Sequence, residues 1–149
     1  MVTMVGNETD IKDLIKNLLY LERDAIAAYD SCIERLDDRT LSAKIAEFKQ
    51  DHLQHVQVLT GMARELGIDA PTEGDMKQML TTGKIALADM LGDAAILKAM
   101  KTNEDDTVTA YERAVRHEDA IPASKAFFIK AHQDEEKHRA WMETTAKTL

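Results

Sequence analysis

Proline, glycine and cysteine are all scarce in this sequence of 149 residues, and each shortage excludes a class of structure. With 2 Pro and 6 Gly, few residues interrupt helices, so the composition favours an all-α fold. The single cysteine, Cys32, excludes an intrachain disulfide and a cysteine-based zinc site. The length suits one domain with its own hydrophobic core, which we expect to span residues 1–149.

Positive charge is also in short supply, because 19 Lys and Arg stand against 27 Asp and Glu, for a net charge of −8. Nucleic-acid backbones require clustered Lys and Arg, so we expect no nucleic-acid partner. The sequence has no long uninterrupted apolar run, and its first residues lack the basic start of a signal peptide. We therefore expect no membrane partner and a cytoplasmic location.

Apolar residues at helical spacing predict four long helices in two antiparallel pairs. Short turns join the helices within a pair, and a long crossover with a short helix joins the pairs. This arrangement predicts a ferritin-like four-helix bundle. The expected long helices are 8–36, 41–67, 94–117 and 122 to nearly 149, and the short helix is 75–91.

Residues at the predicted helix starts support these boundaries. Asn7 or Thr9 is the expected N-cap of the first helix. Gly92 and Asp93 provide a break and an N-cap before the third long helix. Pro122 suits the first turn of the fourth long helix, where its missing N–H has no intrahelical partner.

Each apolar stripe is interrupted near the middle of its helix by residues that commonly bind metals. Because a helix rises about 1.5 Å per residue, helices of similar length place these interruptions at one height in the bundle. Residues three apart on a helix face the same way. The two such residues on the second long helix, and the two on the fourth, can therefore hold one metal centre. A buried, unpaired carboxylate or imidazole is costly, and bound cations are the simplest compensation. The interrupting residues are Glu22, His52, His55, Glu104, Glu135 and His138.

The two halves of the sequence repeat this pattern. The first half carries Glu22 and Tyr29, followed by Asp51-His52-x-x-His55. The second half carries Glu104 and Tyr111 at the same spacing, followed by Asp134-Glu135-x-x-His138. The repeat predicts two helical hairpins related by a pseudo-two-fold axis, with equivalent polar residues brought together.

With these motifs the sequence resembles the ferritin-like di-iron carboxylate superfamily, in particular its rubrerythrin-like members. That family takes one Glu from each of two helices and a Glu-x-x-His motif from each of the other two. The resemblance implies two divalent metal ions, with iron as first choice and zinc or manganese as alternatives. It implies that the ions are held by Glu22, His55, Glu104, Glu135 and His138.

The same resemblance implies that four further residues contact the metal ligands without binding metal themselves. Asp51 and Asp134 match a family acidic residue that precedes the motif and orients a ligand histidine. Tyr29 and Tyr111 lie two turns from the lone glutamates and are candidate outer donors.

His52 departs from the family pattern, because it stands where the family has a glutamate. We predict that His52 binds one metal terminally and leaves Glu135 as the only bridge from the two motif helices. The two sites would then differ in affinity. Two other interpretations stay open: His52 is a core histidine bonded to a carboxylate across the bundle, or it lies outside a five-ligand site. The remaining histidines, His117 and His132, miss the stripes and are predicted at the surface.

The resemblance implies an oxidase or peroxidase that uses O2 or peroxide. One alternative is a non-catalytic protein that sequesters or buffers iron, zinc or manganese. Another is a metal-free four-helix interaction protein whose polar layer fixes the helix register. In each case we expect a homo-oligomer, with a dimer favoured.

Overall fold

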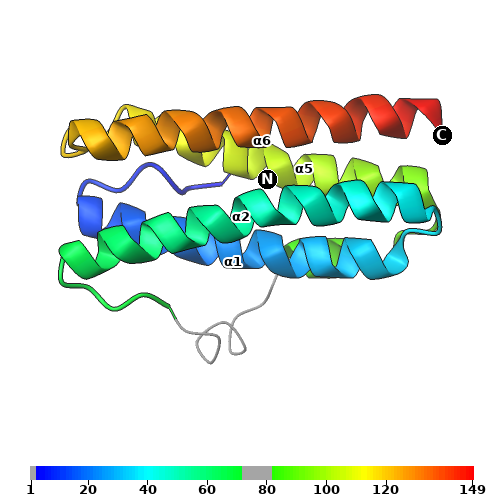
Figure 1. Cartoon of the computed structure of the whole chain (residues 1–149), viewed down its shortest axis with the longest axis horizontal. Helices are drawn as coiled ribbons and strands as arrows, with labels where there is room; N and C mark the ends of the chain where they lie inside the picture. The colour runs from blue at the N-terminus through cyan, green and yellow to red at the C-terminus, as the bar shows by residue number, and fades with distance from the viewer. Residues whose placement is uncertain (1–2, 72–81) are drawn as a thin grey trace.

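The computed structural model describes residues 3–71 and 82–149, and four long helices dominate it (Figure 1). A short helix, α4 (Thr82–Leu87), lies in the connection between the second and third long helices. Of the short helix predicted at 75–91, residues 75–81 lie outside the described residues, and residues 88–91 are not helical, so the helix ends earlier than predicted. The long helices are α1 (Ile11–Arg35), α2 (Arg39–Glu65), α5 (Asp93–Val115) and α6 (Pro122–Thr148).

The long helices form two hairpins, as Figure 1 shows: α1 packs along α2, and α5 packs along α6. Contacts between α1 and α5 join the hairpins, and α4 packs mainly on α1. The predicted all-α four-helix bundle, made of two helix pairs with a long connection between them, is therefore confirmed. None of the described helices is both long and apolar enough to cross a membrane.

Helix α1 begins later than predicted, because its N-cap is Asp10 and not Asn7 or Thr9. The Asp10 carboxylate accepts a hydrogen bond from the backbone N–H of Lys12 at 2.8 Å. Asp10 therefore caps the first backbone N–H groups of α1, which have no partner within the helix. This is the role that was predicted for Asn7 or Thr9.

Asp93 also differs from the prediction, because it is the first residue of α5 and Gly92 is the N-cap. Gly92 has a φ of 86°, a left-handed conformation that glycine adopts without strain. The Asp93 carboxylate accepts hydrogen bonds from the backbone N–H groups of Asp37 and Asp38, at 2.8 and 3.0 Å. It thereby ties the start of α5 to the turn between α1 and α2.

Apolar side chains fill the bundle in two clusters, one on each side of the six interrupting residues. One cluster contains Leu14, Leu18, Leu59, Phe128 and Ala131; the other contains Ile45, Phe48, Leu97, Met100 and Met142. Burial of each large side chain contributes about 1.5–3 kcal/mol. The polar layer between the clusters is therefore shielded from water along the bundle axis.

Candidate metal centre

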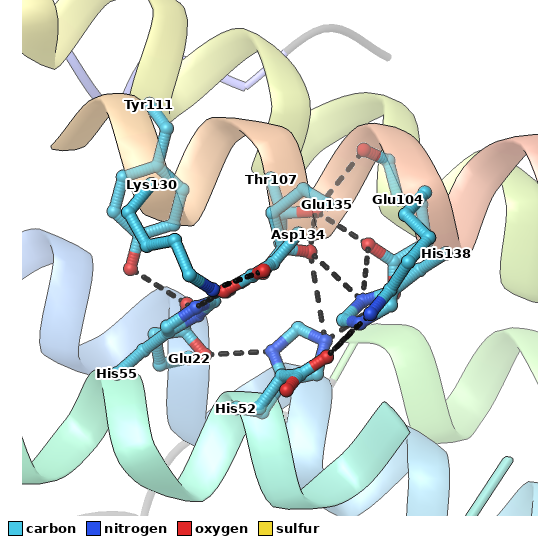
Figure 2. A network of polar contacts seen from close by, with 12 residues as sticks. Glu22, His52, His55, Glu104, Thr107, Tyr111, Lys130, Asp134, Glu135 and His138 are labelled. Carbon is cyan, nitrogen blue, oxygen red and sulfur yellow. Dashed lines mark hydrogen bonds and ion pairs between the residues drawn. The ribbon is translucent and has the colours of Figure 1, made fainter. Parts of the chain in front are cut away.

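The structure brings all six predicted residues together in the bundle core, where each is 2 % exposed or less. Helix α1 positions Glu22 and α5 positions Glu104, while α2 and α6 each contribute two residues. Figure 2 shows the six side chains pointing toward one another from the four helices. Their positions on the apolar stripes thus predicted their burial correctly.

The six residues form two overlapping groups of potential metal ligands. One group is Glu22, His52, His55 and Glu135; the other is His52, Glu104, Glu135 and His138. Within each group, one donor atom per residue lies within 4.8 Å of the others. Imidazole and carboxylate donors suit iron, zinc and manganese. These buried His/Glu groups could therefore hold a metal centre.

Glu22 is the most heavily hydrogen-bonded residue of the first group. It accepts from His52 Nδ1 at 2.7 Å, from His55 Nδ1 at 3.0 Å and from the Tyr111 hydroxyl at 2.6 Å. Burial alone would raise the pKa of Glu22, but the charges and hydrogen bonds of the two histidines hold it well below its usual range. Glu22 is thus an anionic carboxylate.

Protons on His52 and His55 balance the charge of that carboxylate. Burial would lower the pKa of His55, but Glu22, Asp134 and Glu135 raise it to about 11. Burial also opposes the charged form of His52, yet Glu135 and Glu22 raise its pKa well above the usual range. A metal ion in this group would have to displace these protons.

The second group brings two carboxylates close together. Thr107 Oγ1 lies 2.8 Å from Glu104 Oε2 and 2.8 Å from Glu135 Oε2. Burial, and then the neighbouring charge of Glu135, raise the pKa of Glu104 to about 7. Burial is also the main reason that the pKa of His138 is lowered. Two adjacent carboxylates are surroundings that a cation stabilises, and in the metal-free layer the protonated His52 ring is that cation, with Nε2 at 3.4 Å from Glu104 and 3.5 Å from Glu135.

Aspartates outside the layer hold the outer nitrogens of two histidines, in a crossed arrangement. Asp134 on α6 accepts from His55 Nε2 on α2 at 2.9 Å, and Asp51 on α2 lies 2.8 Å from His138 Nε2 on α6. Lys130 donates to Asp134 at 2.6 Å. The predicted contacts of both aspartates with the histidines are confirmed. A carboxylate on Nε2 fixes the ring so that Nδ1 faces the layer.

The tyrosines form a second crossed pair. Tyr29 on α1 donates to Glu104 on α5, and Tyr111 on α5 donates to Glu22 on α1. Burial, followed by the adjacent carboxylates, raises the pKa of both phenols well above the usual range. They therefore keep their protons and act as donors, the outer role predicted for them.

Sequence reasoning missed Thr107 and misplaced His117. Thr107 lies three residues after Glu104, so helical spacing places it on the same face and was a usable signal. His117 was predicted at the surface, but it is buried, and its Nε2 donates to the Glu8 carbonyl at 2.9 Å. The segment before α1 covers His117, which helix periodicity does not reveal. His132 lies nearer the surface and pairs with Glu136 at 2.9 Å.

One buried acceptor supports the fit of a cation to this layer. Glu135 Oε1 has no hydrogen-bond donor among the described residues, although His55 Nδ1 is 3.2 Å away. A buried carboxylate oxygen without a donor is costly unless another positive group satisfies it. The nitrogen and oxygen donors around it match the ligands that divalent first-row metals take.

The fold and the site define a four-helix bundle with a buried His/Glu layer that could hold metal ions. The chain belongs to the family described as Domain of unknown function (DUF2383), whose model matches residues 10–117. The matched range includes Glu22, His52, His55 and Glu104 and ends before α6. No curated protein and no solved structure matches the chain.

Proposed function

We propose that this protein binds two divalent metal ions in its bundle core, in a dinuclear centre for which iron is the first candidate. One observation carries the proposal: Asp134 and Asp51 hold the Nε2 atoms of His55 and His138. His55 Nδ1 then lies 3.0 Å from Glu22, and His138 Nδ1 lies 3.7 Å from Glu135 and 3.9 Å from Glu104. Carboxylate–histidine–metal arrangements of this kind orient ligands in metalloproteins. The ligands in this proposal are Glu22, His52, His55, Glu104, Glu135 and His138.

The likeness to the ferritin-like di-iron family extends the proposal to an oxidase or peroxidase. A bound di-iron centre would supply electrons for the reduction of O2 or peroxide. The residues of this chain would hold and shield the ions. Tyr29 and Tyr111 would fix the carboxylates of Glu104 and Glu22, and the two apolar clusters would exclude bulk water. The non-catalytic alternative is a protein that sequesters or buffers the same ions.

A specific observation favours the metal-free alternative. Almost every inward donor of the layer has a protein partner, for example His52 Nδ1 with Glu22 Oε2 at 2.7 Å. Such a hydrogen-bonded layer can fix the register of a bundle without any ion. Metal content separates this alternative from the proposed function.

The decisive experiment measures metal in the purified protein and then in protein that was stripped with a chelator and reloaded with Fe²⁺ or Zn²⁺. We expect two ions per chain. Each ion at a hundredfold excess over its Kd adds about 2.7 kcal/mol to the free energy of unfolding. At about 2–4 °C per kcal/mol for a domain of this size, two ions raise the Tm by about 10–20 °C.

Two matched variants show whether the layer is responsible. His138→Gln should lose one of the two ions and about half of the rise in Tm, whereas His132→Gln, on the same helix and outside the layer, should keep both ions and the full rise. If the protein takes up no metal and its Tm does not respond to any divalent ion, the proposed function is wrong. Oxidation of the ferrous protein by peroxide then separates an enzyme from a storage protein.

A further inference from the structure

The two residues shared by the groups each present one donor atom to each group. Glu135 places Oε1 at 3.2 Å from His55 Nδ1 and Oε2 at 3.7 Å from His138 Nδ1. His52 places Nδ1 at 2.7 Å from Glu22 and Nε2 at 3.4 Å from Glu104. In Figure 2 the His52 ring lies between its contacts with Glu22 on one side and those of the second group on the other.

Packing holds the His52 ring in this position. The ring is fully buried, with its centroid 4.5 Å from that of Tyr29 and 5.2 Å from that of His138. A side chain enclosed in this way keeps both nitrogens directed into the layer. Packing therefore fixes the contacts that Nδ1 and Nε2 make at the two ends of the ring.

Building on the proposed function, we propose that His52 bridges the two metal ions through its two ring nitrogens. In the metal-free layer His52 carries a proton on each ring nitrogen, so the bridge forms when both protons leave as H⁺ and the imidazolate gives one lone pair to each ion. Glu135 offers Oε1 to the first ion and Oε2 to the second, while the rigid ring of His52, and not this carboxylate, sets the distance between the ions. The first ion then has Glu22 and His55 as its own ligands, and the second has Glu104 and His138.

Charge balance supports this mode of binding. The layer contains three carboxylates, from Glu22, Glu104 and Glu135, which leave two divalent ions with one uncompensated positive charge. An imidazolate at His52 adds the fourth negative charge and makes the buried centre neutral. Because an uncompensated charge is costly in a fully buried site, the neutral arrangement is favoured. His52 thereby restores the charge that the glutamate of the family pattern would provide.

This geometry differs from the terminal binding predicted from the sequence, and the difference is measurable. Two metal–nitrogen bonds of about 2.0 Å with an imidazole ring between them separate the ions by about 6 Å. Ions bridged through carboxylates or water in two-metal sites are about 3.5–4 Å apart. The two sites also become alike, because each receives the same types of donor.

The direct test is anomalous diffraction at the zinc edge from crystals of the zinc-loaded protein. We expect two peaks about 6 Å apart with the His52 ring between them. Two peaks about 3.5–4 Å apart, or His52 on one ion only, would overturn the bridge and leave the proposed function intact. Absence of zinc from the core would instead refute the proposed function itself.

Zinc titration of His52 variants gives a second test. His52→Gln should weaken both binding steps by at least about tenfold, since each site loses a ligand and even an outer partner contributes that much. Terminal binding predicts that only one step weakens, and that result would overturn the bridge. His132→Gln, the matched control, should leave both steps unchanged.

A carboxylate at position 52 keeps the test usable if His52→Gln does not fold. His52→Glu provides a different bridge of the same charge, so it should still bind two zinc ions, with the anomalous peaks now about 3.5–4 Å apart. An unchanged separation between the wild-type protein and His52→Glu would contradict the assignment.

Discussion

Replacing Asp134 with asparagine tests whether the outer carboxylates hold the histidines of the layer in position. Asp134 Oδ2 lies 2.9 Å from His55 Nε2, and its partner Lys130 is 2.6 Å from Oδ1. Burial would raise the pKa of Asp134, but His55 and Lys130 lower it to about 2, so the group is anionic near neutrality. Asparagine keeps the size and removes this charge. His55 then loses a charge-assisted hydrogen bond.

The size of the expected loss in metal affinity depends on how exposed each aspartate side chain is. Loss of an outer partner of a metal-binding histidine costs about 10–100-fold in affinity, or about 1.4–2.7 kcal/mol. The Asp134 side chain is 10 % exposed, so water replaces it poorly, and we expect the upper part of that range. Asp51, which holds His138, is 26 % exposed. We therefore expect Asp51→Asn to lie in the lower part of the range and to affect the other ion.

Competition between the protein and a chromophoric chelator for zinc resolves the two binding steps. Asp134→Asn should weaken one step much more than the other. A double-mutant cycle identifies that step, because Asp134→Asn should add little to His55→Gln and keep its full effect beside His138→Gln. Glu136→Gln, on the exposed side of α6, is the matched control. Equal effects of Asp134→Asn in both backgrounds, or no effect at all, would refute the role of Asp134.

The remaining predictions concern pH and the hydroxyl between two carboxylates. The raised pKa of His55, about 11 against an ordinary 6.5, gives chelator-treated protein stability that is complete below pH 6.5 and is lost as pH rises toward 11. Zinc affinity should rise over the same pH range, because ions displace these protons. From pH 7 through 8 to 9, the free energy of unfolding should therefore fall with chelator and rise with zinc. Parallel trends in the two conditions would contradict the raised pKa of His55. Thr107→Val keeps the side-chain volume and should cost the chelator-treated protein about 1–3 kcal/mol, since the single hydroxyl donor that Glu104 and Glu135 share is lost. Thr102→Val, exposed on the same helix, should change the free energy of unfolding by less than about 0.5 kcal/mol; equal losses from the two substitutions would show that the hydroxyl of Thr107 is unimportant.

Pseudo-symmetry explains part of what the sequence predicted and part of what it missed. Glu22 with Tyr29 repeats as Glu104 with Tyr111, and this repeat correctly indicated two helical hairpins. Thr107 breaks the symmetry, because the equivalent position on α1 is Ala25. Thr107 therefore has no counterpart in the repeat, although it contacts both carboxylates of the second group.

The sequence by itself determined the helices and the burial of the six residues. Periodicity along a helix is a local property, and a polar residue on an apolar stripe must enter the core wherever that stripe is buried. Helical spacing alone was therefore enough to place Glu22 and Glu104 in the layer. The same reasoning failed for His117, because the segment that buries it belongs to another part of the chain.

Only the tertiary structure decided which residues pair. Tyr29 bonds Glu104 and not Glu22 of its own helix, and Asp51 holds His138 and not His55. The relative rotation and height of neighbouring helices set these crossed contacts, and spacing within one helix carries no information about either. The same two quantities turn the nitrogens of His52 toward different groups. The residues of the layer could thus be predicted from the sequence, while their hydrogen-bond partners depended on how the four helices pack.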